Sequence, residues 1–96
     1  MITVLKGAGT VVASADGVWA INASGNPGMA TGGMGDVLAG IIGGLLVQGH
    51  DPWQAACIGV HLHGLAADRI AIDQPYGYTA SEVARQLPQV IGSLCP

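Results

Sequence analysis

The 96-residue sequence predicts an α/β fold from three observations. Short segments with β-strand character come first, a glycine-rich loop follows them, and helical patterns occupy the rest of the chain. Neither an internal repeat nor a linker divides the sequence, so residues 1–96 are expected to form one structural unit. Strands that precede helices around a glycine loop indicate the end of an α/β domain.

Three strands are expected before the glycine loop. Residues 1–5 (MITVL) are typical of a strand, and residues 6–9 are typical of a loop. Residues 10–14 and 18–22 have β-strand character, and Ala15-Asp16-Gly17 between them is a turn signal. We therefore expect these two segments to form a hairpin.

The first expected helix runs from about Asp36 to Gln48, after the glycine loop at residues 23–35. It is apolar and ends at Gly49, a residue type that suits the position just after a helix. Its apolar run at residues 37–47 is about half of the ~20 residues that cross a bilayer, so we expect no membrane span.

Asp51 and Pro52 predict the start of a second helix, as N-cap and first helical residue, and this helix runs to about Ile72. It is apolar on nearly every side, so neighbouring elements should cover most of its faces. Thr79-Ala80-Ser81-Glu82 has the spacing of a capping box and predicts a third, amphipathic helix. Pro88 is expected to kink or split this third helix.

The composition is poor in charge and rich in apolar residues. Charged residues make up 9% of the sequence, against about 25% in a typical globular domain, while hydrophobic residues reach 50%. This charge is too little to cover the surface of an independent small domain, so the composition favours an inner part of a larger domain. Three Lys and Arg residues and a net charge of −3 exclude a basic surface for nucleic acid. Cys57 and Cys95 form no CxxC pair and no signal peptide is evident, so we expect reduced thiols in a cytoplasmic protein.

The strongest functional signal is the stretch at residues 25–49, GNPGMATGGMGDVLAGIIGGLLVQG. A glycine-rich loop that leads directly into a helix can turn successive backbone N–H groups toward an anion, at the positive end of the helix dipole. Asp36 is the only carboxylate between Asp16 and Asp51, and it could take a proton from an attacking hydroxyl. Donors for a phosphate together with one base are the minimum that phosphoryl transfer needs.

A simpler interpretation is that Asp36 is an ordinary N-cap after a flexible turn. The crowding of glycines within residues 28–35 favours a ligand instead, because glycine costs chain entropy that a simple cap does not require. Two familiar phosphate motifs are excluded. The loop lacks the GK[ST] ending of a Walker A motif, and Gly7-Ala8-Gly9 lacks the third glycine of a dinucleotide fingerprint.

Several other polar and aromatic residues predict packing rather than chemistry. His61 and His63 are two apart on a helix, so they point to different faces and cannot form an i, i+4 metal pair. Asp68 and Arg69 are adjacent, and we expect them at a solvated edge. Tyr78 is expected to pack at the start of the third helix.

Residues 26–40, NPGMATGGMGDVLAG, resemble the signature of the ADP-dependent NAD(P)H-hydrate dehydratases, which belong to the ribokinase-like superfamily. The similarity extends upstream to residues 4–10 (VLKGAGT) and downstream to residues 77–81 (GYTAS), so it covers essentially the whole chain. The resemblance implies a three-layer α/β/α domain, of which residues 1–96 would be the C-terminal portion. It also implies an enzyme that repairs NADH and NADPH hydrated at the nicotinamide ring.

The resemblance further implies roles for the matched residues. Asp36 would be the catalytic base that activates the ring hydroxyl, and Asn26 would bind substrate with it. The anion hole for the transferred phosphoryl group would comprise Thr31, Gly32, Gly33 and Gly35. The adenine-nucleotide site would comprise Lys6, Gly7, Ala8, Gly9, Thr10 and Gly35. The implied reaction is phosphorylation of the ring hydroxyl by ADP or ATP, with Mg2+, followed by loss of phosphate.

Two other functions are open at this point. The same loop and aspartate would serve a ribokinase-like small-molecule kinase, although the VLKGAGT and NPGMATGG motifs favour the dehydratase. Alternatively, the chain is a non-catalytic segment that completes a fold only with another chain. We expect the apolar surface to have a partner, which would be a missing N-terminal portion of the domain or a second copy of the chain.

Overall fold

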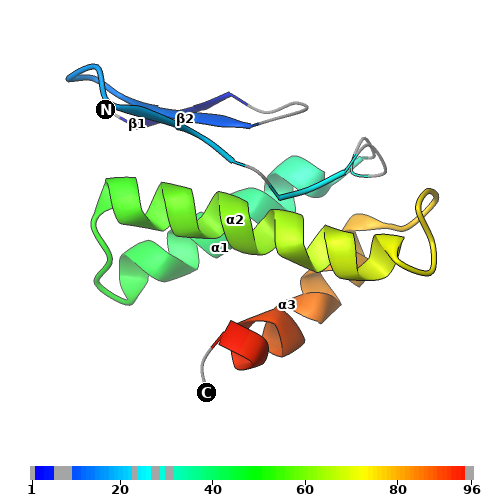
Figure 1. Cartoon of the computed structure of the whole chain (residues 1–96). Helices are drawn as coiled ribbons and strands as arrows, with labels where there is room; N and C mark the ends of the chain where they lie inside the picture. The colour runs from blue at the N-terminus through cyan, green and yellow to red at the C-terminus, as the bar shows by residue number, and fades with distance from the viewer. Residues whose placement is uncertain (1, 6–9, 23, 27–28, 30–31, 95–96) are drawn as a thin grey trace.

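The computed structural model describes residues 2–5, 10–22, 24–26, 29 and 32–94, and it has the predicted α/β class. The strands β1 (Ile2–Leu5), β2 (Val11–Ser14) and β3 (Trp19–Ile21) form an antiparallel sheet in the order β1-β2-β3. The helices α1 (Met34–Val47), α2 (Pro52–Ala71) and α3 (Ala80–Leu94) follow. The sheet lies on one side of the α1–α2 pair and α3 lies on the other (Figure 1).

The predicted hairpin is confirmed. β2 and β3 pair with Val12 opposite Ala20, and the Ser14 N–H donates to the Val18 carbonyl at 2.8 Å across the turn. β1 pairs with the other edge of β2, with Val4 opposite Val12. Opposed residues share a face of the sheet, and Val12 and Val4 pack against helix residues, so this packing fixes the register of the strands.

α1 begins at Met34, two residues earlier than predicted. Its N-cap is Gly33, which has the left-handed conformation with φ 86°. Asp36 therefore lies in the first turn, and the interpretation of Asp36 as an N-cap is wrong. The other end of α1 follows the prediction, because Gly49 has φ 100°, the conformation that commonly ends a helix.

α2 and α3 begin with the side-chain caps that the sequence predicts. Asp51 Oδ1 accepts the Gln54 N–H at 2.9 Å. Thr79 and Glu82 form the reciprocal capping box, in which each residue's N–H donates to the other's side chain at 3.2 Å. α3 continues through Pro88 as one helix, so of the two predicted effects of this proline the split is excluded and the kink stays a prediction.

α2 is the central element of the fold. One hydrophobic cluster joins it to α3 and the start of α1, and its buried members are Met34, Leu62, Ala66, Ala67, Tyr78, Val83 and Val90. A second cluster joins α2 to α1 and the sheet, and its buried members are Val12, Leu38, Ala56 and Val60. Neighbouring elements thus cover most faces of α2, as its apolar sequence predicts.

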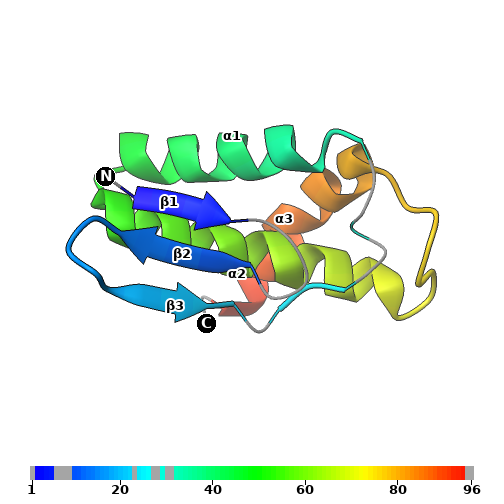
Figure 2. The ribbon, with the colours of Figure 1, turned by 90° about the horizontal axis from the view of Figure 1, so that it is seen from above.

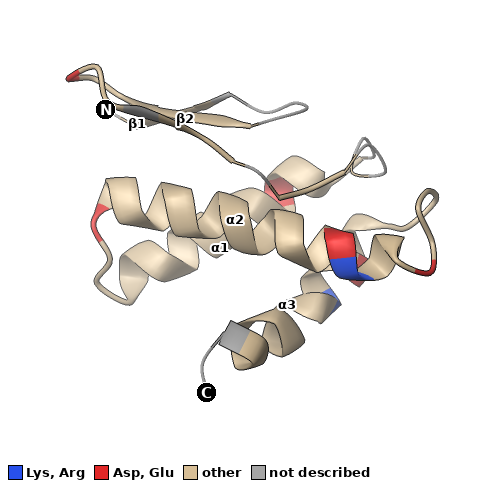
Figure 3. Ribbon diagram, in the orientation of Figure 1, with Lys and Arg blue, Asp and Glu red and all other residues tan. Residues whose placement is uncertain are grey.

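Several large apolar side chains are exposed on this chain. Val18 and Ile21 of the hairpin region are 52% and 61% exposed, and Val47 at the end of α1 is 89% exposed. Charged residues are sparse over the whole ribbon (Figure 3). Among the described helices, none has the length and apolar character needed to cross a membrane.

Gly64 of α2 permits a close approach of the chain, because a Cβ there would lie 2.1 Å from Ser24 Oγ and 2.8 Å from the Ser24 carbonyl carbon. We expect Gly64→Ala to lower the free energy of unfolding by about 1–3 kcal/mol, since the added methyl group displaces this segment. Gly44→Ala is the control, because nothing lies within 4 Å of a Cβ at Gly44 in α1. It should be neutral or stabilising by up to about 1 kcal/mol. Denaturant unfolding measures both, and equal effects would contradict the close approach.

Candidate functional site

The start of α1 is the candidate site, and it lies at the end of the molecule where α2 ends and α3 begins (Figure 2). Gly32 and Gly33 are exposed there, and no side chain among the described residues caps the helix. The Val37 N–H donates to the Gly33 carbonyl at 3.2 Å. The N–H groups that precede it in the first turn have no carbonyl partner within the helix. This end of α1 therefore presents backbone donors, whereas the first-turn donors of α2 and α3 are capped by side chains at their own helix starts.

Asp36 is an exposed residue in the first turn of α1. The helix dipole stabilises a negative charge at this position, and the same dipole and N–H donors favour a bound anion. A phosphate group bound at these donors would lie in the same first turn as the Asp36 carboxylate. This is the local chemistry that the glycine loop predicts.

The predicted anion-hole residues Gly32, Gly33 and Gly35 are contiguous with Asp36 at the start of α1. Of the predicted nucleotide site, Thr10 directly precedes β2, and its carbonyl accepts the Asn22 N–H at 2.8 Å. The other predicted residues of these two sites, Lys6, Gly7, Ala8, Gly9 and Thr31, lie outside the described residues. Their placement stays a prediction.

Gly33 is the glycine whose conformation sets the start of α1. Its φ is 86°, and a Cβ there would lie 3.2 Å from the Ala80 Cβ at the start of α3. We expect Gly33→Ala to lower the free energy of unfolding by about 1–2 kcal/mol, since a side chain disfavours this conformation. Gly32→Ala is the matched control, with nothing within 4 Å of its Cβ, and it should have a smaller effect in the same denaturant titration.

Asn26 is joined to two side chains that the sequence did not assign to the site. Its amide Nδ2 donates to Asp68 Oδ1 at 2.8 Å, and its Oδ1 accepts from the Tyr78 hydroxyl at 2.5 Å. The other Asp68 oxygen, Oδ2, accepts the Gly25 N–H at 2.9 Å. We call Asp68, Asn26 and Tyr78 the Asn26 clamp.

The expectation of a solvated edge is wrong for Asp68, which is half-buried and bonded to the glycine loop, and correct for the exposed Arg69. The sequence does contain a feature that could have predicted the partial burial of Asp68. The residue lies four positions after Gly64 on a helix face of small residues, so it shares that face. A carboxylate at such a position requires polar partners from another segment.

Tyr78 is the clamp residue that belongs to the hydrophobic core, with 1% of its surface exposed. Burial raises the pKa of its phenol, the charge of Asp68 raises it further, and the hydrogen bond with Asn26 partly opposes them. The phenol is therefore kept neutral and acts as a hydrogen-bond donor. The expectation that Tyr78 packs near the start of α3 is confirmed, and its hydroxyl adds a polar contact that the sequence did not predict.

The raised pKa of Tyr78 predicts an alkaline loss of stability. Above pH ~10 an unfolded tyrosine ionises while Tyr78 in the fold stays protonated, so the folded state binds more protons and the free energy of unfolding falls as pH rises. Below that pH the contribution is constant. Denaturant titrations from about pH 8 to about pH 11 should show this decline, and Tyr78→Phe should reduce it. The exposed Tyr76 provides the control, and a decline that Tyr76→Phe removes and Tyr78→Phe does not would contradict this assignment.

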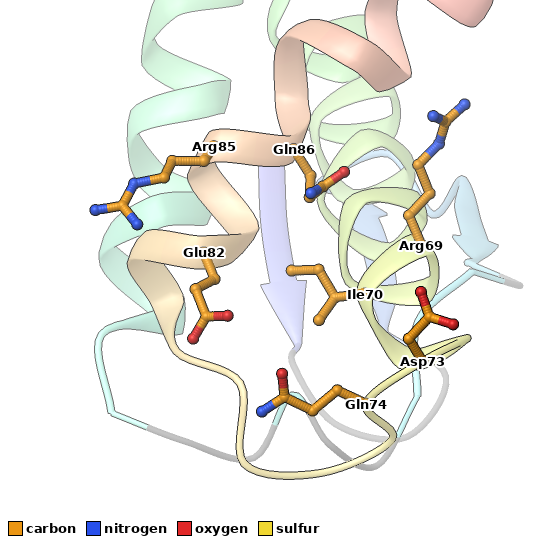
Figure 4. Close-up of a pocket in the computed structure, with 7 residues that line it drawn as sticks. All are labelled: Arg69, Ile70, Asp73, Gln74, Glu82, Arg85 and Gln86. Carbon is orange, nitrogen blue, oxygen red and sulfur yellow. The ribbon is translucent and has the colours of Figure 1, made fainter.

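A shallow hollow of about 280 Å³ lies between the end of α2 and the start of α3. Its lining residues are Arg69, Ile70, Asp73, Gln74, Glu82, Arg85 and Gln86. The guanidinium groups of Arg69 and Arg85 point away from each other, and the two carboxylates of the hollow offset their charge (Figure 4). The two guanidinium groups therefore do not point at a common position in the hollow where an anion could bind both of them.

The buried His63 and the half-buried Cys57 agree with the packing roles predicted for them, whereas the exposed His61 does not. His61 is exposed and His63 is buried, so the two lie on different faces of α2. Within the part of the chain that the structure describes, no group of three or more His, Cys, Asp or Glu residues could hold a metal ion. Cys57 is a half-buried free thiol, and its burial and the charge of Asp51 raise its pKa, which disfavours the reactive thiolate.

The glycine-led start of α1, with a carboxylate in its first turn, has the local features of backbone anion sites at helix starts. Comparison with known proteins identifies the family of the chain. A family model described as NAD(P)H-hydrate dehydratase matches residues 1–89. The bifunctional NAD(P)H-hydrate repair enzyme Nnr of Escherichia coli K12 is 59% identical over 70 residues, which are 73% of this chain and 14% of that protein. The ADP-dependent (S)-NAD(P)H-hydrate dehydratase of Neisseria meningitidis serogroup B is 51% identical over 84 residues, 88% of this chain and 28% of that protein.

The chain belongs to the NAD(P)H-hydrate dehydratase family, as residues 26–40 predict. A crystal structure of the ADP/ATP-dependent NAD(P)H-hydrate dehydratase from Bacillus subtilis, co-crystallized with ATP/Mg2+, matches with a TM-score of 0.88 and 38% identity. The match covers 96% of this chain and 34% of that chain. The chain thus spans less than a third of the curated relatives named above and about a third of this solved structure.

Proposed function

We propose that this chain supplies the phosphoryl-transfer end of an ADP-dependent enzyme that dehydrates 6-hydroxylated NADH or NADPH. The observation that carries the proposal is the exposed, uncapped start of α1, with Asp36 in its first turn, in a chain of the dehydratase family. The relatives and the structure named above bear dehydratase or hydrate-repair names. These names favour the dehydratase over a small-molecule kinase.

In the proposed reaction the ring hydroxyl attacks the terminal phosphoryl group of ADP or ATP, and Asp36 takes the hydroxyl proton. The new C–O–P ester then breaks at its C–O bond. Phosphate leaves with that electron pair, and the neighbouring ring carbon loses a proton to restore the double bond. The balance is one water removed from the ring and one phosphoanhydride bond used.

The chain's own groups fit the nucleotide at the start of α1. The N–H donors of the first turn suit a phosphate, and they stabilise developing charge without moving during the reaction. Gly32, Gly33 and Gly35, with Thr31, would form this anion hole, and Lys6 to Thr10 with Gly35 would line the nucleotide site. Mg2+, which takes carboxylate and phosphate oxygens, would neutralise phosphate charge, and the exposed Asp36 is an oxygen donor of this kind.

The proposed enzyme consists of more than this chain. The B. subtilis structure extends well beyond the matched third, and the composition of residues 1–96 favours a segment of a larger domain. We propose that residues 1–96 act as the C-terminal part of one dehydratase domain. The exposed apolar side chains Ile21 and Val47 would then contact the rest of the domain.

A hydrate-repair assay tests the proposal on residues 1–96, alone and mixed with the complementary segment of the B. subtilis enzyme. We expect turnover of NAD(P)H-hydrate with ADP only in the mixture. Asp36→Asn should slow turnover by about 10²–10⁴ with little change in ADP affinity, since it removes only the base. Asp73→Asn, an equivalent change at an exposed carboxylate just after the end of α2, should leave turnover unchanged.

Three results would contradict the proposal. Absence of repair in the mixture, with the complementary segment shown to bind, would remove the assigned activity. Unchanged turnover in Asp36→Asn would remove Asp36 as the base. Accumulation of a phosphorylated product without NADH or NADPH would identify a kinase instead.

A further inference from the structure

The segment Ser24–Asn26, near the start of the glycine loop, lies against α2 through backbone and side-chain bonds. Ser24 Oγ donates to the His61 carbonyl at 3.0 Å. The absence of a side chain at Gly64 gives Ser24 the space that it occupies. One turn further along α2, Asp68 accepts the Gly25 N–H. The entry to the loop is thus held at successive turns of one helix.

The Asn26 clamp determines the orientation of the Asn26 amide. Asp68 can only accept a hydrogen bond from the amide nitrogen, and the neutral Tyr78 phenol donates to the amide oxygen. A flipped amide would place its oxygen against the carboxylate, so the bond to Asp68 would be lost, and the phenol would have to turn its hydrogen away to accept from the amide nitrogen. The amide therefore has one favourable orientation, with each of its polar ends bonded inside the protein.

The clamp is also connected to the start of α1. Tyr78 belongs to the same hydrophobic cluster as Met34, the first residue of α1, and Met29 from the loop packs against that cluster. The Met29 N–H donates to the Asn26 carbonyl at 3.1 Å. Both ends of the loop are consequently held against the same core, Asn26 at its entry and Met34 at its exit.

We propose that Asp68 and Tyr78 are positioning residues that act through Asn26 to hold the glycine loop in register with the start of α1. They do not contact the reacting groups. Asn26 then serves the site by fixing the loop rather than by binding substrate through its amide. The inference rests on the proposed function for its catalytic consequence, and its structural part stands on the bonds described above.

An exchange of the two side chains tests the clamp. In the double variant Asn26→Asp/Asp68→Asn, the amide at position 68 can accept from the Gly25 N–H and donate to the carboxylate at position 26, which still accepts from Tyr78. Each single variant disrupts this set of donors and acceptors. Asp68→Asn leaves one acceptor for two donors, and Asn26→Asp places two carboxylates together. Tyr78→Phe removes the hydroxyl and keeps the ring, and Asp73→Asn is the control.

The first readout is amide hydrogen exchange of the whole chain followed by NMR. We expect the Gly25 N–H to exchange about tenfold faster or more in Asp68→Asn, the factor typical of a lost bond to a charged acceptor. The double variant should recover most of this protection, and Asp73→Asn should keep all of it. Protection that is unchanged in Asp68→Asn, or that the double variant fails to recover, would overturn the clamp.

The second readout is the steady-state kinetics of the assay mixture described above. We expect Asp68→Asn and Tyr78→Phe to lower kcat, by about tenfold to a hundredfold, with a smaller change in KM for the hydrate, because a displaced loop misaligns the transfer step. The double variant should recover kcat. A KM for the hydrate that rises in every Asn26 variant, the double variant included, would overturn the inference and make the Asn26 amide a substrate ligand. Absence of activity in the unmodified mixture would reject the proposed function but not the clamp, because the hydrogen-exchange readout tests the clamp independently.

Discussion

The close contact between the Ser24–Asn26 segment and α2 is the constraint on which the rest of the structure depends. A glycine at position 64 removes the side chain that would collide with Ser24, and a carboxylate at position 68 satisfies the Gly25 N–H where the loop is half-buried. An unpaired backbone donor at such a place would cost about 1–3 kcal/mol. Because α2 also contributes to both hydrophobic clusters, this contact attaches the loop to the centre of the fold.

The starts of α2 and α3 differ from the start of α1 in how their first-turn N–H groups are bonded. Asp51 caps α2, and Thr79 with Glu82 caps α3, so side chains of the protein use their first-turn donors. The N-cap of α1 is instead Gly33, which offers no side-chain acceptor. The site is thus composed mainly of backbone groups, which is how a chain with 9% charged residues can still present a region suited to an anion.

The apolar surface of the chain agrees with its relation to longer relatives. Helices cover the face of the sheet that carries Val4 and Val12, while Ile21 at the end of β3 is largely exposed. The matched B. subtilis enzyme is about three times as long as the region that this chain covers. In the proposed domain, contacts of the exposed apolar residues with the remaining polypeptide would contribute stability that these 96 residues do not supply by themselves.

The sequence by itself determined the elements whose signals are local. The turn at residues 15–17, the helix end at Gly49, the Asp51 cap and the Thr79–Glu82 capping box all depend on residues within a few positions of each other, and each is present as predicted. The motif at residues 26–40 likewise determined the family, because a contiguous signature needs no knowledge of the fold.

Only the tertiary structure decided the role of Asp68 and the polar contact of Tyr78. These residues lie 42 and 52 positions from Asn26, and no periodicity or capping pattern connects segments so far apart. The position of Asp36 in the first turn was also missed, because Gly33 is an N-cap in the left-handed conformation, where an added Cβ would lie 3.2 Å from the Ala80 Cβ. Local backbone preferences set the individual elements, whereas burial and the pairing of distant polar groups set how the loop meets the helices.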